Sequence, residues 1–368
     1  MKIALDDRIF ISQRYGGISR YFYRLAERFC NAGEEVRVLA PFYCNQYLES
    51  LPRGVVRGLS VDRWPRPLRN RLMALNGPLS AVQLSSWQPQ VLHETYYGMD
   101  RPRCRSVARV VTVHDMIHEI YPAEFADGGY IASCKKRAIE EADHVICVSQ
   151  NTKHDLVRVL GTSESKISVI HHGVDEFVDV GECEIRSERP YLLYVGQRGG
   201  YKNFKELLQA VSASARLRAD FDIIAFGGGP FKTSELAQIT ALGFGEGRVR
   251  QMGGDDRTLA RLYRDAQAFV YPSLYEGFGL PPLEAMARDC AVISSSSSCL
   301  PEIIADAARY FDPLCTDNIR DAIEAVVYDD DERLDLIARG RQRLLAFSWN
   351  RCAQETLVAY QLAVEQAS

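Results

Sequence analysis

The chain has no run of eighteen apolar residues and no CxxC pair among its ten cysteines. The missing apolar run excludes a transmembrane helix of ordinary length. The first ten residues, MKIALDDRIF, hold one lysine and a short apolar run that Asp6 and Asp7 close, so we expect no signal peptide. Without a secretory signal, scattered cysteines predict reduced thiols rather than disulfides or a zinc site. We therefore expect a cytoplasmic protein.

Neither sign of charge dominates the composition. The 368 residues include 44 Lys and Arg against 48 Asp and Glu, a net charge of −4. A protein that binds nucleic acid through bulk charge would carry a clear basic excess, so we expect no nucleic-acid partner. Apolar residues at 46% and charged residues at 25% are typical of a folded globular protein. The length favours two domains.

Several common catalytic motifs are also missing. Segment 191–204 fits neither the P-loop pattern GxxxxGK[ST] nor the dinucleotide pattern GxGxxG. All seven histidines lie between residues 93 and 172, which excludes a Ser-His-Asp hydrolase or a histidine-ligated metal built wholly in the second half. The run from His114 to His118 resembles the zinc motif HExxH, but it follows an apparent strand, so the helical spacing does not apply.

Short apolar runs alternate with longer amphipathic stretches along the chain. This alternation predicts a parallel sheet with helices on both faces, and it occurs twice, so the expected fold class is α/β with two doubly wound domains. Strands are expected at 1–5, 35–41, 91–94, 108–115, 144–149, 166–173, 191–196, 221–229, 248–253, 268–273 and 290–296, and helices at 19–33 and 347–366. The domains are expected at 1–180 and 181–350, with a final helix at 351–368 that packs back on the first domain.

Glu276 and Glu284 flank a loop that follows a predicted strand. Gly277 and Gly279 would let backbone N–H groups approach a ligand closely. The prolines at 281–282 predict a helix start, and a helix N-terminus suits phosphate. The two carboxylates could then accept hydrogen bonds from hydroxyls of a sugar and a ribose. The alternative is structural: Glu284 in the first helical turn would offset the helix dipole, and Glu276 would be a surface acid.

Arg198 and Lys202 lie near the carboxyl end of the strand expected at 191–196, where open α/β sheets bind ligands. Two cations there would suit a diphosphate, or they are solvated surface charges. Gly16 and Gly17 form a turn that could approach a phosphate, or they are glycines for steric reasons only.

His114, at the end of its expected strand, would face a cleft or be a structural histidine. Residues 51–72 hold a single acid, Asp62, and six arginines, at positions 53, 57, 63, 66, 69 and 71. The apolar residues Trp64, Leu68, Leu72 and Leu75 follow at near-helical spacing. This segment is either a solvated surface helix or a face that rests on anionic lipid headgroups.

These segments together resemble the retaining glycosyltransferases of family 4, which have the GT-B architecture of two Rossmann-like domains facing a cleft. The strongest part is YEGFGLPPLEAMA, which holds the E-x7-E motif of that family from Glu276 to Glu284. VGQRGGYKNF is similar to the diphosphate-contacting turn, and RYGGISRY, TVHD and SSCLPEIIADAARYFDP match in kind and order. Relatives often carry Arg where this chain has Tyr201, before the lysine.

The resemblance implies a role for each matched residue. The implied catalytic residues are Glu276, His114, Lys202 and Arg198. The implied donor-binding residues are Gly16, Gly17, Gly277, Phe278, Gly279, Leu280 and Glu284. In this scheme Glu276 holds sugar hydroxyls, Glu284 holds the ribose, and His114 contacts the transferred sugar. Arg198 and Lys202 neutralise the diphosphate, so no metal is needed.

The resemblance is closest in kind to bacterial mannosyltransferases of O-antigen and exopolysaccharide assembly. It implies a hexose donor, with GDP-mannose as the best guess, and a glycan or lipid-linked glycan acceptor for the first domain. UDP-glucose and UDP-GlcNAc are alternative donors. The same scaffold could also be a sugar-nucleotide 2-epimerase or a non-catalytic subunit. A lipid-linked acceptor would place the protein peripherally on the inner face of the plasma membrane.

Overall fold

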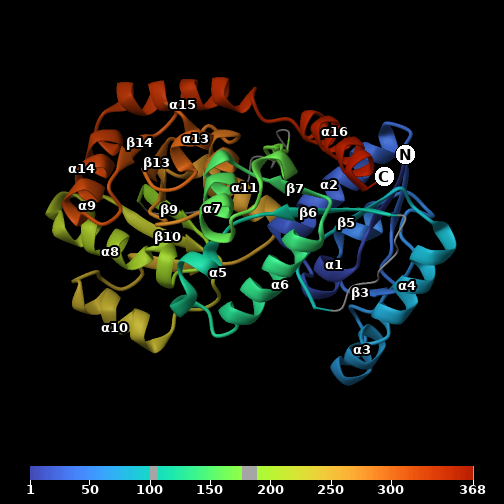
Figure 1. Cartoon of the computed structure of the whole chain (residues 1–368). Helices are drawn as coiled ribbons and strands as arrows, with labels where there is room; N and C mark the ends of the chain where they lie inside the picture. Colours follow the sequence, from blue (N-terminus) through green and yellow to red (C-terminus); the bar gives the residue numbers. More distant parts are fainter. Residues whose placement is uncertain (100–106, 176–188, 368) are drawn as a thin grey trace. The chain divides into compact units, whose positions relative to one another are not determined.

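The computed structural model describes residues 1–99, 107–175 and 189–367 (Figure 1). The chain divides into two compact units, one of Met1–Gly173 with Ser348–Ser368 and the other of Val174–Phe347. The boundary expected near residue 180 lies outside the described residues. Both units are built on parallel strands that alternate with helices, so the predicted α/β fold class is confirmed.

The first unit holds a six-stranded sheet in which every pairing is parallel, in the order β2-β1-β5-β6-β7-β8. Its strands are β1 (Lys2–Leu5), β2 (Glu35–Val38), β5 (Val91–Glu94), β6 (Ala108–Val113), β7 (His144–Cys147) and β8 (Ile167–Val169). A two-stranded parallel pair, β3 (Phe42–Tyr43) with β4 (Leu59–Ser60), forms a separate sheet. Strand β7 is buried at every position and β6 at all but one. Burial on both faces explains why these strands form continuous apolar runs in the sequence.

The helices of the first unit are α1 (Arg8–Ser12), α2 (Gly17–Asn31), α3 (Arg66–Met73), α4 (Asn76–Trp87), α5 (Ile117–Ile120), α6 (Gly128–Glu141), α7 (Gln150–Leu160) and α16 (Trp349–Ala367). Short 3-10 turns are η1 (Tyr47–Ser50), η2 (Pro122–Glu124) and η3 (Glu164–Lys166). Helix α2 buries Tyr21, Leu25 and Phe29, the positions that its spacing indicated. The chain returns to this unit at its end, where α16 packs on α2 and β6.

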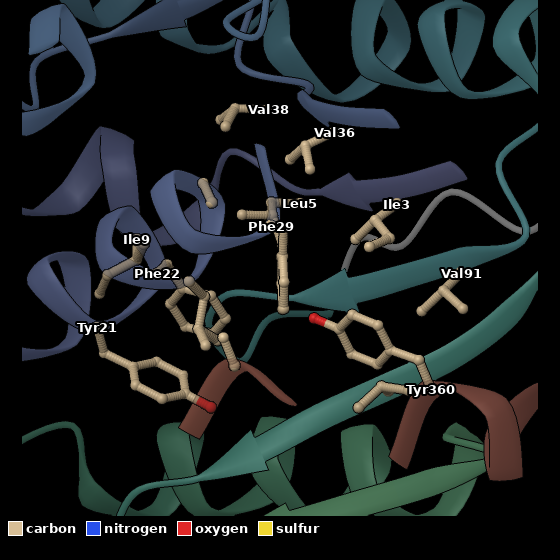
Figure 2. Close-up of a cluster of buried hydrophobic side chains, with 14 of the residues drawn as sticks. Ile3, Leu5, Ile9, Tyr21, Phe22, Phe29, Val36, Val38, Val91 and Tyr360 are labelled. Atoms are coloured by element: carbon tan, nitrogen blue, oxygen red, sulfur yellow. The ribbon is translucent and has the colours of Figure 1, made fainter. Parts of the chain in front are cut away.

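The core of the first unit joins α2, the sheet and α16 (Figure 2). Tyr21 and Phe29 from α2 and Tyr360 from α16 are fully buried with Ile3 and Val91 from the sheet. Side chains of this size stabilise the fold by about 1.5–3 kcal/mol each when removed from water. The last helix is therefore part of the core of the first unit.

The second unit repeats the plan, with sheet order β11-β10-β9-β12-β13-β14. Its strands are β9 (Tyr191–Val195), β10 (Asp222–Phe226), β11 (Val249–Met252), β12 (Ala268–Tyr271), β13 (Val292–Ser295) and β14 (Arg309–Phe311). Its helices are η4 (Gly200–Lys202), α8 (Phe204–Ala213), α9 (Ala215–Asp220), α10 (Thr233–Ala241), α11 (Asp256–Asp265), α12 (Leu280–Met286), α13 (Leu300–Ile304), α14 (Thr316–Val327) and α15 (Asp330–Leu344). Strand β14 was not predicted, because it is a three-residue edge strand with one exposed position and one partly exposed position.

The arginine-rich segment differs from its predicted form. Helix α3 spans only Arg66–Met73, so Trp64 precedes it and Leu75 follows it. Pro65 is the residue before the helix, and proline disfavours a helical conformation in the residue before it, here Trp64. No residue of α3 is buried. Within the described residues, no helix has the length and apolar character to span a bilayer.

Candidate functional site

Four loops of the second unit follow neighbouring strands β10, β9, β12 and β13. Because these strands are parallel, their carboxyl ends lie at one edge of the sheet, which is where open α/β sheets bind ligands. The backbone joins two of the loops directly, since Leu274 N–H donates to the carbonyl of Tyr201 at 2.7 Å. Lys202 lies in the loop after β9, and Glu276 lies in the loop after β12.

Lys202 and Glu276 form an ion pair at this edge, with 2.6 Å between Nζ and Oε1. Their side chains are 15% and 13% exposed, so the pair is mostly shielded but accessible from one side. An ammonium carries three N–H donors, and Glu276 accepts one of them. The arrangement offers a cation and a carboxylate next to one another, which is what a ligand with both phosphate and hydroxyl groups requires.

A serine holds the backbone at Glu276. The Ser298 hydroxyl accepts from the Glu276 N–H at 2.9 Å and donates to the Glu276 carbonyl at 3.1 Å. Ser298 itself has a φ of +51°, a left-handed conformation that non-glycine residues rarely adopt. Sequence reasoning missed this residue, although it ends the serine run 294–298, which was the available signal.

Two buried tyrosines support the lysine side of the pair. The Tyr194 hydroxyl donates to the Gln197 carbonyl and lies 3.3 Å from the Lys202 carbonyl. The Lys202 ammonium lies 5.7 Å from the centre of the Tyr271 ring. Burial, and then the charge of Glu276, hold the pKa of Tyr271 well above its usual value. Tyr271 is therefore neutral and adds no charge beside Lys202. Sequence reasoning missed both tyrosines, whose strand positions indicated only core packing.

The loop from Gly277 to Gly279 is buried and leads into α12 at Leu280. Gly279 has a φ of +90°, and a Cβ there would lie 2.9 Å from the Leu300 side chain, so glycine is required by both conformation and space. The Phe278 ring packs edge-on against Phe347, with 5.8 Å between centroids. Phe278 is thus anchored in the protein, and only backbone atoms of this loop are candidates for ligand contact.

Glu284 does not lie where the sequence indicated. Helix α12 begins at Leu280 and has no acidic residue in its first turn, so the expectation that Glu284 offsets the helix dipole from the first turn is wrong. The prediction had the two prolines open the helix, but α12 begins one residue earlier, at Leu280, and prolines 281 and 282 lie inside its first turn. Glu284 is partly buried, and Tyr263 Oη contacts its Oε2 at 3.5 Å, the outer limit of a hydrogen bond. Its role in ribose binding stays a prediction.

The Arg198 guanidinium faces into the second unit. It donates from Nε to Glu235 at 2.7 Å and from Nη1 to the Gly227 carbonyl at 2.8 Å, and its side chain is 3% exposed. Nη2 contacts the Pro230 carbonyl at 3.2 Å. A direct contact between Arg198 and a diphosphate stays a prediction, and in this arrangement it would require these bonds to be broken.

Gly16, Gly17 and His114 belong to the first unit. Gly17 begins α2, and a Cβ there would meet no atom within 4 Å, so no neighbour in the chain requires glycine at this position. Gly16 precedes it with extended backbone, and a Cβ there would meet the movable end of Gln13. The steric explanation of Gly17 is therefore weak, and close approach of a ligand stays a prediction for both residues.

His114 directly follows β6 and so lies at the end of a strand, as predicted. Its ring lies among aromatic rings, 5.4 Å from Tyr21 and 5.9 Å from a parallel His172. Burial lowers the pKa of His114 to about 4, so the imidazole is neutral near pH 7. Its Nε2 atom is buried and has no hydrogen-bond partner among the described residues. A buried ring nitrogen without a partner is available to a ligand hydroxyl.

The chain is similar to known proteins both in sequence and in fold. Residues 15–176 match the family model described as Glycosyltransferase Family 4, and residues 179–343 match the model described as Glycosyl transferases group 1. The chain is 28% identical over 371 residues to O-antigen chain mannosyltransferase B of Escherichia coli, a match that covers 94% of this chain and 96% of that protein.

Solved structures share the fold, and two of them show how far the likeness extends. Sucrose-phosphate synthase from Thermosynechococcus elongatus superposes with a TM-score of 0.75 at 20% identity, over 98% of each chain. HepE of Anabaena, solved in complex with UDP-glucose, superposes with a TM-score of 0.70 at 15% identity, over 97% of this chain and 99% of that one. At these identities the structures establish the fold alone.

Proposed function

Because the chain belongs to the glycosyltransferases of family 4, whose models match both of its halves, we propose that it transfers a hexose from a nucleotide-sugar donor to a glycan acceptor in bacterial surface polysaccharide synthesis. The observation that carries this proposal is the Lys202–Glu276 pair at the ligand-binding edge of the second sheet. The O-antigen mannosyltransferase named above, which matches over nearly the whole length of both chains, supports the substrate class.

In this proposal Lys202 neutralises the diphosphate as the bond between the sugar and the phosphate breaks. Negative charge develops on the leaving phosphate, and a fixed cation in a shielded site stabilises it without reorganisation. A divalent metal is then not required. Glu276 accepts hydrogen bonds from donor-sugar hydroxyls, and its ion pair with Lys202 orients it.

The proposed transfer retains the anomeric configuration. The acceptor hydroxyl attacks C1 on the face that the diphosphate leaves, the new C–O bond forms as the old one breaks, and the leaving phosphate takes the acceptor proton. Neutral His114 offers Nε2 to a hydroxyl of the transferred sugar. A neutral imidazole suits this role, because it can form a hydrogen bond without adding charge near the anomeric carbon.

For the donor we propose GDP-mannose, since the E. coli relative is named as a mannosyltransferase. UDP-glucose is the main alternative, because HepE, which has the same fold, was solved with it. Thermal-shift binding with GDP-mannose, UDP-glucose, UDP-GlcNAc and ADP-glucose tests this, since a ligand that binds only the folded state raises the melting temperature. Stabilisation by GDP-mannose alone would support the proposal, and stabilisation by a UDP-sugar alone would replace the donor.

The reaction itself is tested with the donor so identified and a bacterial membrane extract. The proposal requires release of free nucleoside diphosphate together with a new glycoside. A changed sugar on an intact nucleotide would instead indicate an epimerase, and no reaction with any donor would indicate a non-catalytic subunit.

We further propose that the acceptor is lipid-linked and that the chain meets it at the cytoplasmic face of the membrane. Support comes from the exposed surface around α3. Trp64, Leu68 and Leu75 are 39%, 45% and 49% exposed, and they lie among exposed arginines. Arginine beside exposed apolar side chains is the combination that binds an anionic lipid surface.

A further inference from the structure

Arg198 is tied to a three-glycine loop that follows β10. Gly227, Gly228 and Gly229 have φ values of +93°, +68° and +68°, so each adopts the left-handed conformation. Such a loop has a large conformational entropy when it is not restrained, because glycine loses more freedom on folding than any other residue. The loop therefore needs an external restraint to keep one shape.

At Gly227 the N–H donates to the Met252 carbonyl at 2.9 Å and the carbonyl accepts from Gln251 Nε2 at 3.3 Å. The Arg198 side chain adds a restraint that reaches further along the loop. Its Nη1 donates to the Gly227 carbonyl at 2.8 Å, and its Nη2 lies 3.4 Å from the Gly228 carbonyl and 3.2 Å from the Pro230 carbonyl. The Phe231 ring covers the guanidinium, whose central carbon lies 4.7 Å from the ring centroid. A planar fork of N–H donors is the side chain that can hold several carbonyls at once.

Glu235 fixes Arg198 from the other side. Its carboxylate accepts from Arg198 Nε at 2.7 Å and from Nη2 at 3.3 Å, and it also accepts from the Lys232 N–H at the start of α10 at 2.7 Å. The glutamate thus joins the arginine to the helix that follows the loop. The donors of Arg198 are thus taken by this carboxylate and by the loop carbonyls, so a direct contact with a phosphate would require these bonds to be broken.

The loop lies directly against the Lys202 loop. The Gly196 N–H donates to the Phe226 carbonyl at 3.0 Å, and a Cβ on Gly227 would lie 3.5 Å from the Gly196 carbonyl oxygen. In a trans peptide the carbonyl and the following N–H point in opposite directions. The carbonyls of Gly227 and Gly228 face Arg198, so the N–H groups of Gly228 and Gly229 point away from it.

We propose that Arg198 is a positioning residue: with Glu235 it fixes the Gly227–Gly229 loop so that its amide groups contact the nucleoside diphosphate, and it does not itself neutralise the phosphates. Charge neutralisation is then left to Lys202. This inference rests on the proposed function, because it needs a nucleotide donor at this edge of the sheet. It assigns to Arg198 a different role from the one that its position in the sequence indicated.

The first test compares salt dependence. Binding of UDP and GDP is measured by calorimetry at low and high salt for wild type, Arg198→Met and Lys202→Met, with Arg320→Met on α14 as the matched control. Loss of a phosphate counter-ion flattens the salt dependence, because salt screens charge–charge attraction. We expect Arg198→Met to bind about tenfold or more weakly, because the loop is misplaced, with the wild-type salt dependence kept. If Arg198→Met flattens the dependence as much as Lys202→Met, the positioning role is overturned.

The second test begins with a substitution that leaves the charges of Arg198 and Lys202 in place. Gly228→Ala places a Cβ 2.6 Å from Arg198 Nη1 at a φ of +68°, so it should displace the loop and weaken nucleotide binding by a similar factor. Glu235→Gln should weaken binding in wild type but add nothing in the Arg198→Met background, since the two act as one unit. The proposal would be overturned if Gly228→Ala bound nucleotide as well as wild type does. It would also be overturned if the losses of binding from Glu235→Gln and Arg198→Met were additive.

The two tests separate this inference from the proposed function. If the wild-type chain binds neither nucleotide and transfers no sugar, the proposed function fails and the positioning role fails with it. If the wild-type chain binds and transfers while Arg198→Met and Gly228→Ala bind normally, only the positioning role fails. Thermal unfolding of each variant shows whether it folds, and Gly228→Ala keeps the inference testable if the Arg198 variants do not fold.

Discussion

Lys202 and Glu276 stand 74 residues apart in the chain, yet 2.6 Å separates the lysine Nζ from the glutamate Oε1. Strands β9 and β12 lie side by side and run in parallel, so the loops after them meet at the same edge. Both side chains are largely shielded from water. Removal of one partner from such a pair leaves the other charge poorly solvated, which destabilises a protein more than loss of a surface pair does.

Substitution of Glu276 should abolish transfer. Glu276→Ala removes the carboxylate that we assign to the donor-sugar hydroxyls, and the chain should still fold because the Ser298 contacts are to the backbone of residue 276. The measurement is release of nucleoside diphosphate under initial-rate conditions. Glu246→Ala, at an exposed position, is the matched control. Turnover of the Glu276 variant within a few-fold of wild type would remove this residue from the mechanism.

Lys202→Ala should slow the chemical step. Loss of one fixed donor to a developing oxyanion raises the barrier by about 2–4 kcal/mol. The measurement is kcat for wild type and variant with and without a chelator. We expect chelator to leave wild-type turnover unchanged, because Lys202 supplies the positive charge. Activity that stops with chelator and returns with Mg²⁺ or Mn²⁺ would contradict the metal-free proposal.

Glu284→Ala should weaken nucleotide binding with little effect on kcat. Two hydrogen bonds from ribose hydroxyls to a carboxylate are worth about 1.5–3 kcal/mol each when one partner is charged. The Kd for the nucleoside diphosphate is the quantity to measure. Tyr263→Phe is the control, because its 3.5 Å contact with Glu284 contributes little. Equal Kd values for wild type and Glu284→Ala would show that the carboxylate has no part in ribose binding.

Buried histidines should make the first unit sensitive to acid. His93 is fully buried between Tyr360 and Thr112, at 2.7 Å and 2.8 Å, and burial lowers its pKa to about 3. Below about pH 6.5 the unfolded chain binds a proton at this residue and the folded chain does not, so stability falls as pH falls through this range, by about 1.4 kcal/mol per pH unit. Above about pH 6.5 this loss is absent.

The check is denaturant unfolding of wild type and His93→Gln at neutral and mildly acidic pH. The variant should be less stable at neutral pH, because it disturbs two buried hydrogen bonds. Its stability should also fall less steeply with acidification, by about 1.4 kcal/mol per pH unit, because the variant lacks the one proton that His93 takes up on unfolding. Identical pH slopes for the two proteins would show that His93 is not the titrating group.

The surface around α3 should bind anionic vesicles in a salt-sensitive way. Each basic residue close to an anionic leaflet contributes roughly 1 kcal/mol, within a Debye length of the surface. Sedimentation with anionic and with neutral vesicles, at low and high salt, measures this. The Arg66/Arg69/Arg71→Glu variant should lose binding to anionic vesicles. If wild type and variant sediment equally at low salt, the surface is merely solvated.

Much of the fold could be predicted because buried positions appear in the sequence as apolar residues in a regular pattern. Central strands such as β7 and β12 are buried at every position, so each forms an apolar run in the sequence, and α2 shows its buried face at Tyr21, Leu25 and Phe29. The short edge strand β14 leaves too weak a pattern to be detected. The end of α3 at Met73 was also not predicted, because helical spacing of Leu72 and Leu75 continues beyond the point where the backbone turns.

The sequence by itself determined the candidates for the site: the carboxylates at 276 and 284, the cations at 198 and 202, and a histidine at a strand end. The tertiary structure decided what each of them touches. Lys202 meets Glu276, whereas Arg198, four residues earlier, turns to Glu235 and a glycine loop. The reason is physical: spacing along the chain fixes which loop a side chain belongs to, but its partner depends on which strands are neighbours in the sheet and on which nearby carbonyls and carboxylates compete for its donors.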